Sequence, residues 1–133
     1  MSSFAYLGRP LYPLIVVEDL DAVRQFYLDR LEAAEVFASP RYLQVRFGEG
    51  GPELAFMRAG VTELDGTETP FSGRGVVVSI PVADADAHAA GVAERGIILA
   101  SPPSDKPWQW RSFTVKDPSG LVLDFFHELK PQR

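Results

Sequence analysis

The sequence predicts an α+β fold in which two βαβββ modules follow one another in a single domain. Three observations predict it. A chain of 133 residues with 46% hydrophobic and 23% charged side chains can bury one core. Its 11% aromatic content favours a sheet-rich fold or an aromatic-lined pocket over a helical bundle. The third observation is an internal repeat, which places the first module at about residues 10–58, a linker at about 59–73 and the second module at about 74–128.

The repeat consists of three pairs of short segments that occur in the same order in both halves. VEDLDA at 17–22 is answered by VADADA at 82–87, VFASP at 36–40 by ILASP at 98–102, and LAFM at 54–57 by LDFF at 123–126. Because three ordered matches rarely arise by chance, we expect the two halves to share one fold.

Each half begins with an apolar run typical of a β-strand, at residues 11–17 and 75–82. An aspartate suited to cap a helix follows each run, Asp19 in the first half and Asp84 in the second. Behind each aspartate, apolar side chains recur at helical spacing, and Gly96 marks the end of the second helix. Both helices are therefore expected to lie against a sheet.

Three short strands follow each helix. We expect them at residues 35–38, 41–47 and 53–57 in the first half, and at 98–100, 111–116 and 121–127 in the second. The segments GEGGP and DPSG form the turns before the last strand of each half, because proline fixes φ and glycine adopts conformations that other residues resist. The polar segment 58–74 is long for a loop, which indicates a functional flap or a mobile linker.

Charge and composition exclude several classes of function. The formal net charge is −5, with 13 basic and 18 acidic residues, so neither nucleic acid nor a membrane surface is an expected partner. The chain has no cysteine, which excludes disulfides and thiolate metal sites. The N-terminus lacks a secretory signal pattern, and no apolar run approaches the ~20 residues of a membrane span. We therefore expect a cytoplasmic protein.

The paired βαβββ pattern, the Asp-capped helices, the FY pair at Phe26 and Tyr27, and the motif PW...R.F.V.DPSG at residues 107–120 together resemble the vicinal oxygen chelate superfamily. This superfamily contains glyoxalases, bleomycin resistance proteins and extradiol dioxygenases. The resemblance covers residues 11–128 and implies a cupped, mixed eight-stranded sheet with the helices outside. It also implies a homodimer whose modules pair across chains, and pairing of the two halves within one chain is equally compatible.

In metal-dependent members of that superfamily, ligands lie at the start of the first strand and within the fourth strand of each module. The corresponding residues here are Tyr12, Ala55, Val77 and Asp124. A catalytic metal needs about three N, O or S ligands. Asp124 alone is a good donor, because a tyrosine keeps its proton up to about pH 10. A different alignment of the fourth strand would substitute Glu53 or Phe56 and raise the total to two at most. We therefore expect no cofactor.

Asp124 is the leading single candidate. Strand alternation puts it on the concave face where the superfamily binds ligands, and there it can accept a hydrogen bond or act as a general base. The alternative is an ion pair with a nearby arginine: Arg111, Arg46 or Arg41. By the same alternation His127 points to the opposite face, and His88 lies beside the apolar stripe of the second helix.

Aromatic residues are expected to line the cavity. Trp108 and Trp110 share a face if their segment is extended, and by resemblance one or both stack on a planar ligand. The alternative is that they close the edge of the curved sheet. The expected ligand-binding residues are Tyr12, Phe47, Trp108, Trp110, Arg111, Phe113, Asp124 and Phe126.

The leading hypothesis is a metal-independent protein of the bleomycin-resistance type that captures an aromatic or amphipathic small molecule. The alternative is an enzyme, either a glyoxalase-like lyase or isomerase, or a dioxygenase, with a divalent metal in an atypical site, or a metal-free isomerase with Asp124 as base. A third hypothesis is a domain that acts through protein contacts alone. The sequence contains neither a phosphate-binding loop nor a nucleophile elbow, so it gives no support to a phosphate-binding or hydrolase function.

Overall fold

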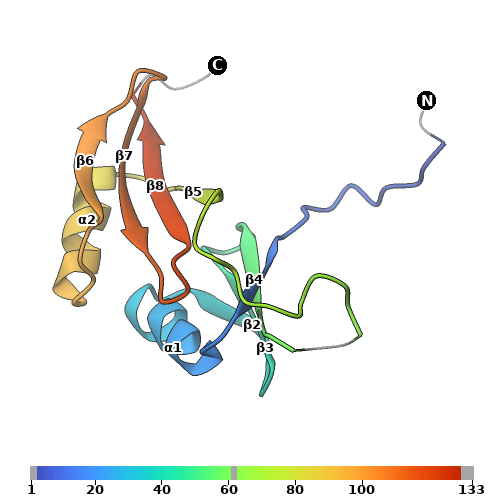
Figure 1. Cartoon of the computed structure of the whole chain (residues 1–133). Helices are drawn as coiled ribbons and strands as arrows, with labels where there is room; N and C mark the ends of the chain where they lie inside the picture. Colours follow the sequence, from blue (N-terminus) through green and yellow to red (C-terminus); the bar gives the residue numbers. More distant parts are fainter. Residues whose placement is uncertain (1–2, 61–62, 130–133) are drawn as a thin grey trace.

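The computed structural model describes residues 3–60 and 63–129. It confirms the α+β class and the two tandem βαβββ modules (Figure 1). The first module consists of β1 (Leu14–Val17), α1 (Leu20–Arg24) continued by the π-helical turn η1 (Gln25–Arg30), β2 (Ala34–Ser39), β3 (Tyr42–Arg46) and β4 (Glu53–Arg58). The second consists of β5 (Val77–Pro81), α2 (Ala85–Glu94), β6 (Ser101–Asp105), β7 (Trp110–Lys116) and β8 (Val122–Glu128).

The eight strands form two hydrogen-bonded sheets of four, in the orders β1-β4-β3-β2 and β5-β8-β7-β6. In each sheet the first and last strands of the module pair in parallel, and the other pairs are antiparallel. Leu14 lies opposite Ala55, and Ser79 lies opposite Asp124. Because Leu14 and Ser79 each precede a capping aspartate by five residues, Ala55 and Asp124 occupy equivalent places, as the match of LAFM with LDFF predicts.

Aspartates cap both helices as predicted. The Asp19 carboxylate accepts a hydrogen bond from the Ala22 amide at 3.0 Å, and the Asp84 carboxylate accepts one from the Asp86 amide at 3.0 Å. Gly96 follows the end of α2 with φ of +83°, a conformation that glycine adopts without strain. Helix α2 covers one face of the second sheet (Figure 1).

One strand differs from the prediction. The repeat predicts a strand at 98–100, but β6 begins at Ser101, and Ile98 lies outside it with 89% of its surface exposed. Strand β6 contains Pro102 and Pro103, which cannot donate backbone hydrogen bonds, and it tolerates them because it is an irregular edge strand. VFASP lies within and just after β2, whereas most of ILASP precedes β6. The two segments are similar in sequence but do not occupy the same place in their strands, so the match put the predicted strand a few residues too early.

The two modules meet through the side of the molecule that carries the helices. The Tyr27 hydroxyl from η1 donates to the Asp117 carboxylate at 2.6 Å, and both side chains are buried. Asp117 also accepts hydrogen bonds from the amides of Ser119 and Leu121. At the end of α2, Arg95 donates to the Asp29 carbonyl at 2.8 Å. The FY and DPSG motifs therefore contact each other and join the modules.

Part of the segment between the modules packs against the body rather than forming a free flap. The Phe71 amide donates to the Val16 carbonyl at 2.8 Å, its side chain packs against the core, and Thr67 is buried. Residues 61 and 62 of this segment lie outside the described residues. In the described ranges, no helix is both long and apolar enough to span a membrane.

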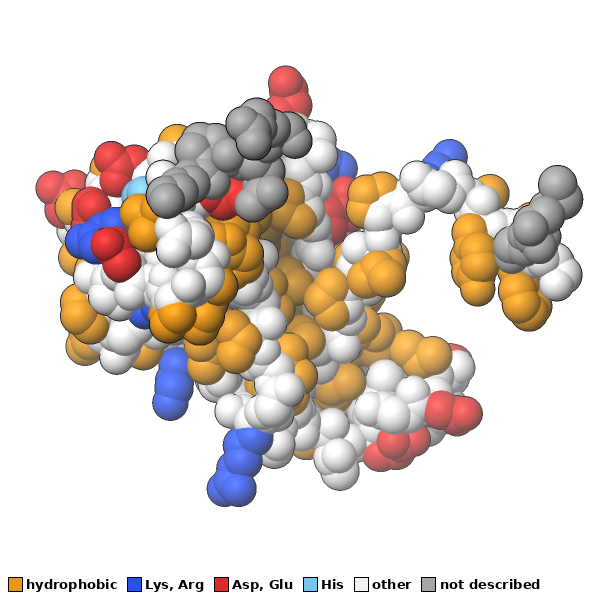
Figure 2. Space-filling view, turned by 90° about the horizontal axis from the view of Figure 1, so that it is seen from above, with side chains coloured by type: hydrophobic (Ala, Val, Ile, Leu, Met, Phe, Trp, Pro, Cys, Tyr) orange, Lys and Arg blue, Asp and Glu red, His pale blue; other side chains and the backbone are white. Residues whose placement is uncertain are grey.

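The chain begins with an extended arm, residues 3–13, that projects from the body (Figures 1 and 2). Figure 2 shows apolar side chains along this arm, well separated from the rest of the surface. The arm leads directly into β1, so its last residues lie at the edge of the first sheet.

Candidate functional site

Each sheet has one face buried in the core and one face open to solvent. Strand alternation separates the two faces. In β8, Leu123 and Phe125 are buried against the helix side, whereas Asp124 and Phe126 are partly exposed on the other face. The open faces therefore carry the side chains that can meet a ligand.

A row of four polar side chains crosses the open face of the second sheet. Asp124 lies between Ser79 of β5 and Thr114 of β7, and Thr114 lies opposite Ser101 of β6. The Ser79 hydroxyl donates to Asp124 Oδ2 at 3.2 Å, and the Ser101 and Thr114 hydroxyl oxygens are 2.7 Å apart. The row presents one carboxylate and three hydroxyls, which together can accept and donate hydrogen bonds to a bound molecule.

An aromatic stack borders this row. The rings of Trp110 and Phe126 are 3.7 Å apart and inclined by 13°. Trp108 meets Trp110 edge-on at 6.5 Å and 75°, and 59% of its surface is exposed. Gln109 between them has φ of +69°, so the segment turns rather than extends, and the two indoles do not form one flat surface. Trp110 and Phe126 supply the flat apolar surface of this face.

The carboxylate of Asp124 has no cationic partner in the part of the chain that the structure describes. Arg111 projects from the α2 side of β7, where it binds both carboxylate oxygens of Asp86 and one of Asp105, each at 2.9 Å. The hydrogen bond to Asp86, followed by that to Asp105, raises the pKa of Arg111. The hydrogen bond from Arg111 in turn lowers the pKa of Asp86. Arg46 pairs with Glu53 in the other module. The ion pair that could have neutralised Asp124 is therefore not formed.

The open face of the first sheet carries a hydrogen-bonded chain of side chains. The Tyr42 hydroxyl donates to Gln44 Oε1 at 2.8 Å, Gln44 Nε2 donates to Glu53 Oε1 at 2.6 Å, and Arg46 Nε donates to Glu53 Oε2 at 3.1 Å. The hydrogen bonds from Gln44 and then Arg46 hold the pKa of Glu53 below its usual value. Burial, helped by a hydrogen bond with Tyr12, raises the pKa of Tyr42 to about 12.

A hollow of about 430 Å³ lies on this first face, between the base of the N-terminal arm and the turn that joins β3 to β4. Tyr12, Arg46 and Glu53 line it together with Leu11. Its volume lies within the range of about 300–1,000 Å³ that is usual for small-molecule sites. The first module therefore contributes a concave surface, and the second contributes the aromatic stack and the carboxylate.

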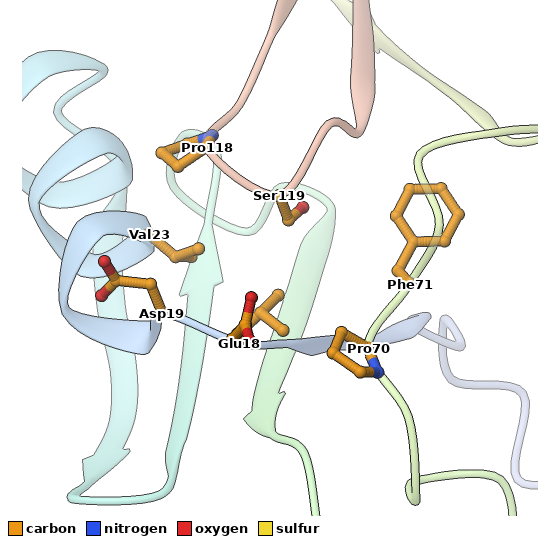
Figure 3. A pocket seen from close by; sticks show the side chains of 8 residues that line it. Glu18, Asp19, Val23, Pro70, Phe71, Pro118 and Ser119 are labelled. Carbon is orange, nitrogen blue, oxygen red and sulfur yellow. The ribbon is translucent and has the colours of Figure 1, made fainter.

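A smaller cavity of about 170 Å³ lies where the start of α1, the linker and the β7–β8 turn come together (Figure 3). Its polar side chains include Asp19 and Ser119, shown in Figure 3 beside Glu18. Asp19 already caps α1, and the Ser119 hydroxyl donates to Asp117 at 2.6 Å. Because two of the three polar side chains that line it, Asp19 and Ser119, already form hydrogen bonds within the protein, we assign this cavity to the seam between the modules.

The family model described as Glyoxalase/Bleomycin resistance protein/Dioxygenase superfamily matches residues 9–125. The chain belongs to this superfamily. Among solved structures, a glyoxalase/bleomycin resistance protein/dioxygenase from Nocardioides is similar, with 26% identity, a TM-score of 0.75, and coverage of 96% of this chain and 89% of that one.

Two further solved structures are similar. A glyoxalase/bleomycin resistance protein from a Streptomyces species has 25% identity and a TM-score of 0.67, with coverage of 86% of this chain and 96% of that one. A superfamily member from Sphaerobacter thermophilus has 23% identity and a TM-score of 0.70, with coverage of 94% and 98%. No curated protein matches this chain.

Half of the residues predicted to bind ligand lie together in this superfamily member. Trp110, Asp124 and Phe126 share the open face of the second sheet, and Trp108 lies beside them. Tyr12 lines the hollow of the first sheet instead. Among the described residues, no hydrogen bond or ion pair joins the polar groups of the two open faces.

The other predicted residues lie elsewhere. Phe113 is fully buried on the α2 side of β7, and Arg111 projects from the same side. The Phe47 ring packs against that of Tyr27 near the junction of the modules, with 6.1 Å between the ring centres. Because side chains of neighbouring residues in a strand point to opposite faces, Arg111 and Phe113 cannot share a face with Trp110. We do not include these three residues in the proposed site.

Sequence reasoning missed Ser79, Thr114 and Ser101, which complete the polar row. The repeat contained a signal for Ser79. It makes Ser79 equivalent to Leu14 and Asp124 equivalent to Ala55, and Leu14 pairs with Ala55 across the strands just as Ser79 pairs with Asp124. Thr114 and Ser101 depend on the antiparallel register of β6, β7 and β8, which no local pattern in the sequence encodes.

Both histidines lie on the helix side of the second sheet. His127 Nδ1 accepts a hydrogen bond from the Ala85 amide at 2.8 Å, which agrees with the expected orientation away from Asp124. The His88 ring lies 4.7 Å from that of Phe125, and burial lowers the pKa of His88. Neither imidazole is near the polar row.

The donor set of this superfamily member does not fit a catalytic metal. Of its four family positions, Ala55 and Val77 have no donor atom, Tyr12 has a phenol, and Asp124 has the single carboxylate. In the described ranges, no group of three His, Asp or Glu side chains is close enough to hold a metal ion. Glu53, the alternative donor, is already bound by Gln44 and Arg46. The residues present therefore do not support the metal-dependent chemistry of the family.

Proposed function

We propose that this protein binds a planar aromatic or amphipathic small molecule, without a metal or other cofactor, on the open face of the second sheet. The observation that carries the proposal is that Asp124, without a cationic partner in the described chain, shares the open face of β8 with Phe126, on which the Trp110 ring stacks. The ligand carries a positive charge or a hydrogen-bond donor that meets this carboxylate.

The chemistry of the face selects this ligand class. A flat ring stacks on the indole of Trp110, and aromatic pairs contribute about 0.5–1.5 kcal/mol beyond the area they bury. A hydrogen bond to an ionised carboxylate contributes about 1.5–3 kcal/mol. Ser79 donates to one oxygen of Asp124, so this hydroxyl orients the carboxylate for the ligand. An anion gains neither the charge interaction nor the hydrogen bond.

Membership of the superfamily supports the proposal, because the superfamily includes bleomycin resistance proteins, the type of member that we propose here. The similar structure from a Streptomyces species is itself a glyoxalase/bleomycin resistance protein. The role that follows for this chain is sequestration or delivery of its ligand in the cytoplasm.

Tryptophan fluorescence tests the proposal directly, because the chain has two tryptophans. In a Trp108→Phe background, Trp110 is the sole tryptophan, so selective excitation of tryptophan reports on this residue alone. We would titrate it with 9-aminoacridine, a planar cation, and with 9-anthracenecarboxylate, an anion of the same ring shape. The proposal predicts saturable quenching by the cation and a much weaker response to the anion. Equal responses to both, or no saturable response to either, would contradict it.

A second candidate function uses the same carboxylate as a general base in a metal-free isomerase. It is favoured by the position of Asp124, which is partly exposed on the open face and can reach a substrate proton. Asp124→Asn separates the two functions, since the side chain keeps its shape and loses its charge. A binding protein loses affinity for the ligand, whereas an isomerase loses turnover and keeps much of its affinity.

A further inference from the structure

One buried hydroxyl on the open face of the second sheet lacks a hydrogen-bond partner. Ser112 of β7 is 1% exposed, and within residues 3–60 and 63–129 its Oγ is the one buried side-chain polar atom that forms no hydrogen bond. Ser112 lies opposite Phe126 and therefore on the face that carries Asp124. A buried hydroxyl without a partner has lost its hydrogen bonds to water and gained none in return, so such atoms are rare and need an explanation.

Two aromatic rings close over this hydroxyl. The neighbours of Ser112 on the open face are Trp110, Thr114, Phe126 and Ser104. Trp110 and Phe126 stack on each other with 3.7 Å between the ring centres. Ser104 and Thr114 are small, so the two rings provide most of the cover. The stack therefore keeps water away from the Ser112 hydroxyl and leaves its hydrogen bond unmade.

The hydroxyl groups at this place can donate hydrogen bonds. Lys106 Nζ donates to Ser104 Oγ at 2.6 Å, so the hydroxyl proton of Ser104 stays available to another acceptor. Ser104 pairs with Ser112 across the strands, which makes the two hydroxyls neighbours. Ser112 and its own free proton therefore belong to a donor group rather than to an acceptor group.

Strand geometry sets the distance from this donor group to Asp124. Ser112 lies opposite Phe126, and Phe126 follows Asp124 by two residues, which is roughly 7 Å along the strand. A flat molecule of two fused rings is long enough to meet Asp124 with a group at one end and Ser112 with a group at the other. The open face therefore offers an acceptor and a donor at opposite ends of one ligand.

We propose that the ligand of this face carries a neutral hydrogen-bond acceptor, such as a carbonyl oxygen, that accepts a hydrogen bond from the Ser112 hydroxyl. This inference rests on the proposed function and narrows its ligand class: a positive charge or donor at one end meets Asp124, and the acceptor at the other end meets Ser112. The acceptor is neutral, because a charge enclosed beside the rings loses its hydration. It reaches the hydroxyl when the ring of Trp110, the partly exposed first residue of β7, swings off Phe126.

Two probes that differ only in the acceptor test the proposal by titration calorimetry. Both are 2-(aminomethyl)naphthalene, one with a 6-acetyl group and the other with a 6-isopropenyl group, in which CH2 replaces the ketone oxygen. We expect the natural chain to bind the ketone about 10-fold more tightly, because the ketone alone pairs the buried hydroxyl. Equal affinities of the natural chain for the two probes would overturn the proposal.

Ser112→Ala locates the acceptor. The variant should bind both probes with the affinity that the natural chain has for the isopropenyl probe. Ser39→Ala is the matched control: it removes a hydroxyl from the first module, where Ser39 Oγ accepts a hydrogen bond from the Arg41 amide, and it should keep the preference for the ketone. A preference for the ketone that persists in Ser112→Ala would overturn the proposal, since the acceptor would then meet another group.

Unfolding in urea shows whether the Ser112 hydroxyl is unpaired in the folded protein. Ser112→Ala removes a buried hydroxyl that has no partner to lose, so its urea midpoint should equal or exceed that of the natural chain. A midpoint clearly below the natural one would show that the hydroxyl already has a partner, which would overturn the proposal.

Asp124→Asn keeps this proposal distinguishable from the proposed function. If both probes bind equally to the natural chain and more weakly to Asp124→Asn, the proposed function stands and the Ser112 contact is refuted. If the preference for the ketone depends on Ser112 while Asp124→Asn binds as the natural chain does, the Ser112 contact stands and the role of Asp124 is refuted. If neither probe binds the natural chain, both are refuted.

Discussion

Replacing Tyr27 with phenylalanine removes one hydroxyl from the junction of the two modules and leaves the ring packing intact. This hydroxyl donates to Asp117 at 2.6 Å, and the two residues are 0% and 5% exposed. A hydrogen bond to a charged group contributes about 1.5–3 kcal/mol, and its loss leaves a buried carboxylate oxygen with one partner fewer. We expect Tyr27→Phe to lower the free energy of unfolding by about 2 kcal/mol, which corresponds to a fall in Tm of about 6 °C.

The pH dependence of stability gives a second signature of the same contact. Burial, followed by the charge and hydrogen bond of Asp117, raises the pKa of Tyr27 well above its usual value. The unfolded chain therefore ionises this tyrosine first, near pH 10. Its stabilising contribution is complete below about pH 10 and is lost as the pH rises toward the folded pKa, at up to about 1.4 kcal/mol per pH unit. The Tyr27→Phe protein should not lose this contribution to stability at high pH. It should still lose the contribution of Tyr42, whose pKa is also raised.

Urea unfolding at neutral pH and at several values between about pH 9 and pH 11 measures both effects. Tyr6→Phe is the matched control, because Tyr6 lies on the arm with 83% of its surface exposed. A Tyr27→Phe protein within about 0.5 kcal/mol of the natural one, with the same alkaline loss of stability, would refute the structural role of this contact.

Three further predictions concern the cap, the core and the proposed site. Asp84→Ala removes the carboxylate that caps α2 and should cost about 1 kcal/mol in urea unfolding, whereas an unchanged midpoint would argue against the cap. Phe113→Ala opens a cavity beneath α2 and should cost about 3–5 kcal/mol in the same assay, and a loss below about 1 kcal/mol would show that the ring is not packed as described. Asp124→Asn should weaken 9-aminoacridine binding about 10-fold by fluorescence with little change in stability, and unchanged affinity would remove Asp124 from the site.

The fold was predictable because its signals are local. An apolar run, a capping aspartate and a helical stripe lie within a few residues of one another, and the repeat supplies them twice. The register of Ala55 and Asp124 followed from the repeat as well. The strand predicted at 98–100 failed because ILASP looks like a strand locally, whereas the pairing partner Thr114 selects Ser101 as the start of β6.

The site was predictable in part. Asp124 and Phe126 follow from alternation in one strand, whereas Trp110, which directly precedes the strand expected at 111–116, was chosen from the resemblance. Arg111 and Phe113 were chosen for their residue type, although alternation from Trp110 already puts them on the other face. The position of Phe47 depends on packing against Tyr27, and the polar row depends on cross-strand register, so neither can be derived from a local pattern.

Metal content measured together with ligand binding shows whether this site binds its ligand through Asp124 and Trp110 without a metal ion. We would quantify Ni, Zn, Mn and Fe per chain in natively purified protein that has not met a chelator, and then measure 9-aminoacridine binding before and after chelator treatment. We expect metal far below one ion per chain and the same affinity for 9-aminoacridine in both samples. Near one ion per chain, with binding abolished by the chelator, would contradict metal-free binding.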